Sequence, residues 1–257
     1  MGNELHRAAL READLNAELS PYWRVSVVDV TGSTQLDLEE NIRARTALDG
    51  DVLIANYQSA GRGRLDREFI AAPSSAILFS FYKKISRPRE EWNFIALLAA
   101  LSISDALKNL DHDIPVNIKW PNDILVKDKK IAGLLCQAES EGVIVGIGLN
   151  VSMREDELPV ETATSLLLEN YTELDRNIIV KRILQIFEEK FSIWESRGSE
   201  PFISDYEKAC SSLQRQIQII QPHDDSKIAI ATSISSLGEL VLEDGTLVNS
   251  ADVVHLR

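Results

Sequence analysis

Cysteine is scarce in this sequence, and its scarcity excludes folds that depend on several disulfide bonds or on cysteine-bound zinc. Only Cys136 and Cys210 occur among 257 residues, which is too few for a disulfide framework. Neither cysteine lies in a CxxC or CxxxH pattern, and the four histidines are scattered without metal-ligand spacing. We therefore expect a protein of a reducing compartment, the cytoplasm, and the sequence leaves the ligands of any metal ion unknown.

Long hydrophobic runs and an excess of basic residues are also missing. The longest apolar stretch, residues 94–103, is interrupted by Ser102 and is much shorter than the roughly 20 residues of a membrane span. Charged residues throughout residues 1–20 exclude a signal-peptide core there. Lysine and arginine total 27 against 40 acidic residues, and the net charge of −13 repels nucleic-acid phosphates. We expect neither a membrane nor a nucleic-acid partner.

Periodicity divides the chain into three parts. Helical spacing over residues 5–19 predicts an N-terminal helix within residues 1–22, and Ser20-Pro21 ends it. Residues 23–209 contain segments with helical periodicity and segments typical of strands, which predicts an α+β domain. Its strands are expected at 25–30, 52–57, 76–83 and, as an antiparallel meander, 116–120, 130–139 and 142–151; its helices are expected at 35–45 (capped by Thr34), 91–110, 177–195 and 201–209. Short strands separated by turn signals predict a small barrel over residues 210–257.

A long loop over residues 58–75 contains the first candidate site, the string Gln58-Ser-Ala-Gly-Arg-Gly-Arg64. Its two glycines permit close approach of a ligand to the backbone, and Arg62 and Arg64 present planar donors suited to carboxylate or phosphate. Together with Arg67 they make a local anion site on an acidic protein. A solvated turn is the alternative, and the string alone does not decide between the two.

The second candidate site, Lys119-Trp-Pro-Asn-Asp123, follows an apolar strand. A lysine at the end of a rigid element can stabilise charge that develops on a phosphorus or carboxyl oxygen, and Pro121 fixes the following turn. Asn122 and Asp123 have the alternative role of capping that turn.

Gly146 and Gly148 alternate inside an apolar strand, where glycine weakens a sheet and therefore needs a reason. A flat ligand lying against that face is one explanation. A β-bulge is the other, and the sequence leaves both open.

Taken in order, these strings resemble the biotin protein ligase family. The matching segments are Gly32-Ser-Thr-Gln35, Gln58 to Arg64, Lys119 to Asp123, Lys130-Ile-Ala-Gly133, Gly146 to Asn150 and Thr164-Ser-Leu166, with VVHL near the C-terminal end. The KWPND string is the most specific of them, and the resemblance spans about residues 24–170.

The resemblance implies a catalytic domain related to class II aminoacyl-tRNA synthetases and lipoate ligases, with a mixed, largely antiparallel sheet, followed by an SH3-like β-barrel. It also implies an ATP-dependent ligase that forms biotinyl-5'-AMP from biotin and MgATP. The biotin then passes to a lysine of a biotin carboxyl carrier protein, part of acetyl-CoA carboxylase or a related carboxylase.

The family pattern also implies roles for individual residues. Lys119 and Arg64 would be catalytic. The biotin-binding set would be Ser33, Thr34, Gln35, Gln58, Arg62, Gly63, Arg64 and Lys119, and the nucleotide-binding set Arg64, Phe69, Lys119, Asn122, Lys130, Gly133 and Asn150.

Three residues depart from the family pattern. Gln35 stands where asparagine is usual, Asp66 where another glycine is common, and Phe69 where tryptophan is common. Phe69 can still stack but lacks an N–H donor. These departures put the ordering of the loop and the affinity for ligand in question.

Two rival readings remain. A lipoate ligase or an octanoyltransferase would share the fold, but the transferase needs a thioester-forming cysteine, and Cys136 lies in an apolar strand typical of a core position. A biotin-responsive repressor would carry a DNA-binding domain, whereas only about 22 residues precede the first strand of this acidic chain. We therefore expect the monofunctional type, as a monomer or a homodimer.

Overall fold

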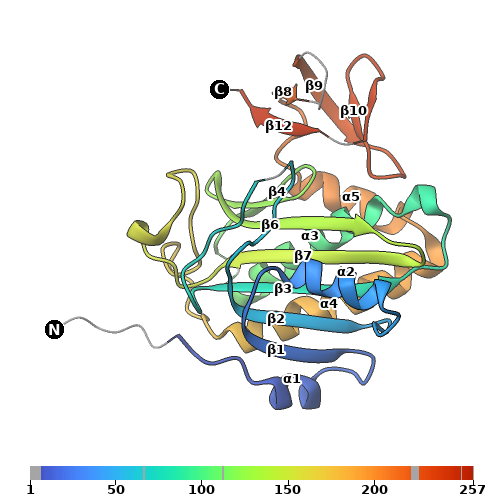
Figure 1. The fold of residues 1–257 in the computed structure, drawn as a ribbon. Coiled ribbons are helices and arrows are strands. Elements are labelled where there is room, and N and C mark those ends of the chain that lie inside the picture. The colour runs from blue at the N-terminus through green and yellow to red at the C-terminus, as the bar shows by residue number, and fades with distance from the viewer. Residues whose placement is uncertain (1–6, 66, 112, 221–225, 250, 257) are drawn as a thin grey trace.

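A seven-stranded mixed sheet organises the larger part of the molecule (Figure 1). The computed structural model describes residues 7–65, 67–111, 113–220, 226–249 and 251–256. The strand order is β1-β2-β3-β7-β6-β5-β4. The strands are β1 (Arg24–Thr31), β2 (Asp51–Gln58), β3 (Ala76–Lys84), β4 (Val116–Lys119), β5 (Asp123–Val126), β6 (Lys129–Ala138) and β7 (Gly142–Asn150).

Only β1 and β2 pair in parallel, and every other neighbouring pair in this sheet is antiparallel. The predicted mixed, largely antiparallel sheet is therefore confirmed. The meander contains one strand that the sequence prediction missed, because β5 is only four residues long and directly follows the KWPND turn. Lys127 and Asp128 connect β5 to β6 with positive φ angles of 49° and 63°, which makes a tight turn where the KDKK string predicted one.

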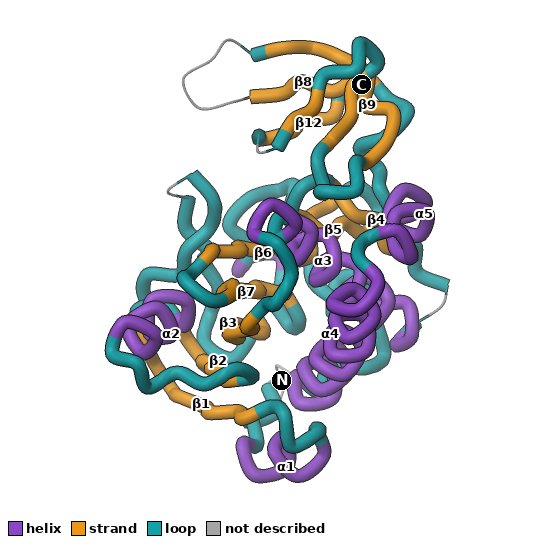
Figure 2. The backbone as a smooth tube through the Cα atoms, turned by 90° about the vertical axis from the view of Figure 1, so that its right-hand side faces the viewer, coloured by secondary structure: helices purple, strands orange, loops and turns teal. Residues whose placement is uncertain are grey.

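Helices cover the two faces of the sheet unequally, as Figure 2 shows. Helix α2 (Thr34–Arg43) lies alone on one face, and α3 (Phe94–Leu110) and α4 (Arg176–Arg197) pack together on the other. Helix α5 (Glu200–Ala209) and the short 3-10 turns η1 (Arg89–Glu91) and η2 (Glu155–Glu157) complete the helical elements after α2. The sparsely covered face around α2 leaves room for a site.

The N-terminal helix is shorter than predicted: α1 spans Glu12–Glu18, and residues 7–11 are not helical. Backbone groups of residues 8–11 bind side chains of α4 instead. Arg176 donates to the Ala8 carbonyl at 2.9 Å, and Asn177 bonds both to the Ala9 carbonyl and to the Arg11 amide. These tertiary bonds prevail over local helix propensity. The first part of the predicted helix, residues 5–6, lies outside the described residues.

Helix α2 begins one residue earlier than predicted, at Thr34, so the N-cap position belongs to Ser33. The Thr34 side chain is directed to Gln58 and Ser80 and does not cap the helix.

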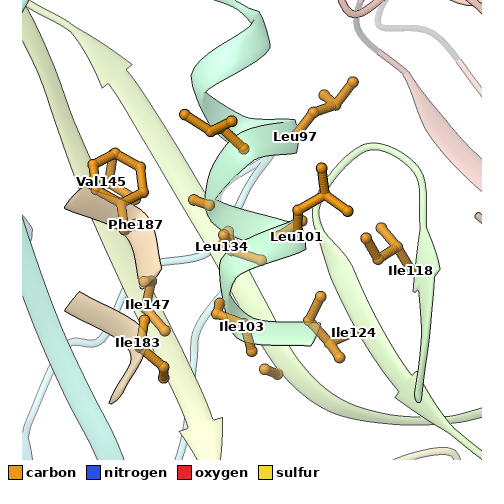
Figure 3. Packing of buried hydrophobic residues seen from close by; sticks show 14 of the residues in the cluster. Leu97, Leu101, Ile103, Ile118, Ile124, Leu134, Val145, Ile147, Ile183 and Phe187 are labelled. Carbon is orange, nitrogen blue, oxygen red and sulfur yellow. The ribbon is translucent and has the colours of Figure 1, made fainter. Parts of the chain in front are cut away.

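The main core lies between the sheet and helices α3 and α4 (Figure 3). Leu97, Leu101 and Ile103 of α3 meet residues of β4 to β7, and Ile183 and Phe187 of α4 extend the same layer. Side chains of a strand alternate between its faces. Val145 and Ile147 therefore enter this core, while Gly146 and Gly148 face the α2 side.

A separate five-stranded sheet follows α5, with order β11-β10-β9-β8-β12 and antiparallel pairing throughout. Its strands are β8 (Gln216–Ile220), β9 (Lys227–Ile234), β10 (Leu240–Leu242), β11 (Leu247–Val248) and β12 (Asp252–His255). It fits the expected SH3-like unit and lies beside the β4 end of the main sheet (Figure 1). One buried cluster runs from Leu15 through the main core to Val253, so α1 and the small sheet share it.

The segment Arg89–Leu110 is the one described helix whose length and composition would suit a membrane span. Within its apolar window, 67 % of the residues are buried inside the protein. It is thus accounted for as the central core helix.

Replacing Leu101 with alanine tests this core. Leu101 is 2 % exposed, so the substitution removes buried methyl groups and leaves a cavity, which should lower the free energy of unfolding by about 2–5 kcal/mol. Urea denaturation monitored by tryptophan fluorescence measures the change. Leu48→Ala is the control, because Leu48 is 58 % exposed and its truncation should change stability by less than about 0.5 kcal/mol. Equal effects of the two substitutions would contradict the assigned core.

Candidate functional site

A cavity of about 240 Å³ opens on the α2 face of the sheet, between the loop after β2, the turn after β4 and strand β12. Most of the residues singled out in the sequence line it. They are Ser33, Thr34, Gln35, Gln58, Arg62, Gly63, Arg64, Phe69, Lys119, Asn122, Lys130 and Gly133. The structure therefore brings the glycine-arginine string and the KWPND string, 55 residues apart between Arg64 and Lys119, to one place.

The glycine-arginine loop folds back on itself as a tight hairpin. The Gly63 amide donates to the Arg67 carbonyl at 2.7 Å, and the Phe69 amide donates to the Gly61 carbonyl at 2.8 Å. A Cβ atom at Gly61 would lie 2.4 Å from the Phe69 carbonyl oxygen, so this close approach requires glycine. Asp66, one of the three departures, lies outside the described residues.

Arg64 is directed into the cavity. Its Nη1 donates to the Asn122 Oδ1 and to the Ala251 carbonyl, both at 3.3 Å, and burial lowers the pKa of its guanidinium. A guanidinium stays charged even so. A half-buried cation on a cavity wall favours the anion-site interpretation of this loop over a solvated turn.

Lys119 ends β4 and is half-buried at the cavity wall. Burial lowers the pKa of its ammonium, and the Asp123 carboxylate partly opposes that shift. The neighbouring Trp120 is 1 % exposed and donates from its indole Nε1 to the Gly238 carbonyl at 3.1 Å. The lysine therefore stands on a firmly anchored turn, as the sequence predicted.

Asn122 and Asp123 hold the strands around this turn. Asn122 exchanges two hydrogen bonds of 2.9 Å with Leu134 of β6, one through its side-chain amide and one through its backbone carbonyl. Asp123 forms an ion pair of 2.6 Å with Lys130, whose side chain crosses Gly133. The turn-stabilising role that the sequence left open is present, and both residues also line the cavity.

Buried hydroxyl and amide groups form a chain at the α2 end of the cavity. Gln58 Oε1 accepts from the Thr34 amide at 2.7 Å and from the Thr34 hydroxyl at 2.9 Å. The Ser80 hydroxyl lies 2.8 Å from the Thr34 Oγ1 and 3.3 Å from the Gln35 Oε1. Sequence reasoning missed Ser80. The available signal was a serine in the otherwise apolar segment Ala76–Tyr82.

The alternating glycines have a steric explanation that neither sequence alternative foresaw in full. Strand β7 pairs in continuous register with β3 and β6 at both glycines, so the β-bulge is excluded. A Cβ atom at Gly146 would lie 2.4 Å from the Gln35 Oε1, and one at Gly148 would lie 2.6 Å from the Phe69 ring. A flat group does lie against Gly148, and it is a side chain of the protein itself.

Asn150 does not line the cavity. Its side chain is 5 % exposed and donates to the Thr164 carbonyl at 2.9 Å, which ties the end of β7 to the Thr164-Ser-Leu166 string. Its predicted contact with a nucleotide has no support in this arrangement and stays a prediction.

The small sheet supplies cavity residues without any local motif in the sequence. Ile220 of β8 and Asp252, Val253 and Val254 of β12 complete the lining, and Asp252 forms an ion pair with Arg67. Such residues can be found only once the two sheets are placed together.

Cationic side chains are concentrated around the cavity, although the protein as a whole has a net charge of −13. Its cationic lining residues are Arg62, Arg64, Arg67, Lys119 and Lys130, and its acidic ones are Glu68, Asp123 and Asp252. Within the described ranges, no group of three or more histidine, cysteine or acidic residues could hold a metal ion. The site is therefore suited to an anionic ligand.

Cys136 lies close enough to Arg64 for the guanidinium to act on its pKa, yet burial dominates and raises the pKa of the thiol to about 12. The group is therefore a protonated thiol at neutral pH, not a thiolate nucleophile. A thioester mechanism through Cys136 is disfavoured.

Comparisons with known proteins identify the family of this chain. The family model described as the biotin/lipoate A/B protein ligase family matches residues 27–153. The biotin--[acetyl-CoA-carboxylase] ligase of Mycobacterium tuberculosis is 34 % identical over 242 residues, which make up 91 % of this chain and 90 % of that protein. The bifunctional ligase/repressor BirA of Escherichia coli is 27 % identical over 87 % of this chain and 70 % of that protein.

A solved structure gives the same result for the fold. The biotin protein ligase from Aquifex aeolicus in complex with biotin and ATP has a TM-score of 0.79 and 25 % sequence identity, covering 90 % of this chain and 99 % of that one. The sequence match extends over about nine-tenths of both proteins, and the fold match covers 90 % of this chain. This chain belongs to the biotin protein ligases of the biotin/lipoate A/B protein ligase family.

Proposed function

We propose that this protein is an ATP-dependent biotin protein ligase, which forms biotinyl-5'-AMP and then biotinylates a lysine of a carboxyl carrier protein. The observation that carries the proposal is the convergence of Arg64 and Lys119 on one cavity. The chemistry joins two anions, a carboxylate and a triphosphate, which repel each other. Cations held on the cavity wall offset that repulsion and the charge that develops in the transition state.

The two ends of the cavity differ in chemistry, and this difference orients the substrate. The chain of Thr34, Gln58 and Ser80 offers hydroxyl and amide groups that match the donors and acceptors of a ureido ring. The cationic end, with Arg64 and Lys119, suits the carboxylate of biotin and the α-phosphate of ATP. Biotin would therefore lie with its ring toward α2 and its carboxylate toward the lysine turn.

In the first step the biotin carboxylate attacks the α-phosphorus and pyrophosphate leaves. Lys119 and Arg64 hold the reacting anions in line and in contact, which lowers the entropic part of the barrier. In the second step the carrier lysine attacks the anhydride carbonyl and AMP leaves. Phe69 and the loop hairpin cover the cavity at Gly148 and limit the access of water to the anhydride.

Magnesium belongs to the proposal as a companion of ATP. The cavity wall offers Asp123 beside the lysine turn but no complete set of protein ligands within the described residues. Magnesium bound to nucleotides takes most of its ligands from phosphate and water, so one nearby carboxylate is compatible with this use.

The rival activities have less support. A lipoyl ring has no ureido group to pair with the Thr34, Gln58 and Ser80 chain, and the Cys136 thiol is protonated. The acidic balance of the chain also opposes DNA binding. The carrier protein, the cytoplasmic location, and the monomeric or homodimeric state stay predictions.

Lys119→Ala should reduce biotin-dependent pyrophosphate exchange with ATP by at least about 100-fold, because a preorganised charge at the reacting oxygens is lost. The matched control is Lys129→Ala, an exposed lysine on the neighbouring β5–β6 hairpin that does not line the cavity. Lys129→Ala should exchange at the rate of the unsubstituted protein. Exchange by Lys119→Ala within about threefold of that rate would refute the proposed role.

Ser80→Ala should raise the KM for biotin about five- to tenfold while leaving the KM for ATP unchanged, because one hydrogen-bonding group is lost at the ureido end. Ser102→Ala is the control: Ser102 is also fully buried, but its hydroxyl donates to the Leu98 carbonyl within α3, away from the cavity. Steady-state exchange kinetics separate the two constants. A KM for biotin that responds equally to both substitutions would contradict the assignment of the ureido end.

A further inference from the structure

Strand β12 contacts both halves of the cationic site. It is four residues long and lies at the edge of the small sheet, paired with β8. Its beginning contacts the glycine-arginine loop, and its end is connected to the KWPND turn. These are the two segments whose convergence the proposed reaction requires.

The beginning of β12 binds two arginines of the loop. The Asp252 carboxylate pairs with Arg67, and the preceding Ala251 carbonyl accepts from Arg64 at 3.3 Å. The Asp252 side chain is only 14 % exposed although that of Arg67 is 67 % exposed, so the carboxylate is directed inward at the cavity rim. One charge-assisted bond and one neutral bond therefore fix the loop to the strand.

The end of β12 is connected to the KWPND turn through a serine. The His255 Nε2 lies 2.9 Å from the Ser212 Oγ, and the same oxygen accepts from the Trp120 backbone amide at 3.1 Å. Ser212 is fully buried, so no water competes for its hydroxyl. Trp120 follows Lys119 directly in the chain, so this connection reaches the residue next to the proposed catalytic lysine.

Arg215 sets the tautomer of His255. Its Nη1 lies 3.2 Å from the His255 Nδ1, and a guanidinium can only donate, so Nδ1 accepts and Nε2 carries the proton. His255 therefore donates to Ser212. Burial, together with Arg215 and Lys119, lowers the pKa of the imidazole to about 4, so the ring stays neutral at physiological pH.

The strand between these contacts is held firmly at its middle and along its length, so it can keep its two ends at a fixed separation. Val253 is 3 % exposed and anchors the middle of β12 in the shared core, and four ladder positions pair the strand with β8. From residue 251 to residue 255 an extended chain spans about 13 Å, a length that suits the bridging of a small-molecule site.

We propose that β12 is a brace that fixes the glycine-arginine loop relative to the KWPND turn, with Asp252 and His255 as positioning residues of the ligase reaction. The proposal rests on the proposed function. Asp252 acts through Arg67 and its neighbour Arg64, and His255 acts through Ser212 and Trp120 on Lys119. The small sheet thereby sets the separation of the two cations that hold the biotinyl-AMP anion.

The test uses the full chain with Asp252→Asn, His255→Leu, the double variant, and His255→Gln, which keeps an N–H donor for Ser212. The rate at which bound biotinyl-AMP dissociates should rise about three- to tenfold in each of the first two variants. His255→Gln should return that rate to within about twofold of the unsubstituted protein. The double variant should show less than the product of the single effects, because cutting either end of one brace releases the same constraint.

Asp244→Asn is the matched control. Asp244 forms an exposed ion pair with Lys227 in the same small sheet and does not line the cavity. Its dissociation rate should be unchanged, and thermal unfolding of every variant identifies any general loss of stability. Multiplying effects in the double variant, failure of His255→Gln to rescue, or unchanged rates in both single variants would each overturn the brace.

A second readout does not depend on activity. In the ligand-free protein, His255→Leu should accelerate hydrogen exchange of the Gly63 and Phe69 amides, which close the loop hairpin at the other end of β12. Unchanged exchange at both amides would also overturn the brace. Absence of biotin-dependent pyrophosphate exchange by the unsubstituted protein would instead contradict the proposed function. Failure of the brace proposal and failure of the proposed function are therefore distinguishable.

Discussion

Mutual repulsion among the cationic side chains of the cavity must be offset by the residues that surround them. Arg64, Arg67 and Lys119 converge on a space suited to an anion, and bringing like charges together in a partly buried site costs free energy while no anion is bound. Carboxylates at the rim reduce that cost: Asp252 pairs with Arg67, and Asp123 pairs with Lys130. The Arg64 guanidinium also donates to the Asn122 Oδ1 and to the Ala251 carbonyl, which holds it at the cavity wall.

The fold serves this constraint by assigning the two faces of the sheet to different tasks. Helices α3 and α4 cover one face with a continuous apolar core, and the other face carries α2, the loop hairpin and the cavity. Strand β7 shows the division within one segment. Val145 and Ile147 enter the core, and the glycines Gly146 and Gly148 leave space on the site side for Gln35 and Phe69.

Most of the fold could be predicted from the sequence because its long elements have clear periodicity. The strands at 25–30, 52–57 and 76–83 and the two long helices were placed within a few residues of their observed bounds. Two short strands were missed, β5 with four residues and β11 with two. Residues 7–11 failed for another reason, because side chains of α4, some 170 residues away, decide their conformation.

The site residues likewise fall into those that the sequence predicted and those that it did not. Residues inside contiguous strings, such as those of the loop and the lysine turn, were predicted because the strings taken in order resemble a known family, whereas each string alone left a structural alternative open. Ser80 was missed because one serine in an apolar strand is a weak signal. Asp252 was missed because the residues next to it in the sequence form no recognisable motif. Asn150 belonged to a matching string, yet its side chain ties β7 to Thr164. A string marks a segment that matters without saying which of its members face the ligand.

The shared core of the two sheets has a thermodynamic consequence. Because the buried cluster that contains Leu15 also contains Val253 of β12, the small sheet packs into the same core as the main sheet, and we expect the two to unfold together. The cavity takes its walls from both sheets, so a ligand bound there favours the native form of the entire chain. A ligand bound at this site should therefore raise the resistance of the whole protein to heat and to proteolysis.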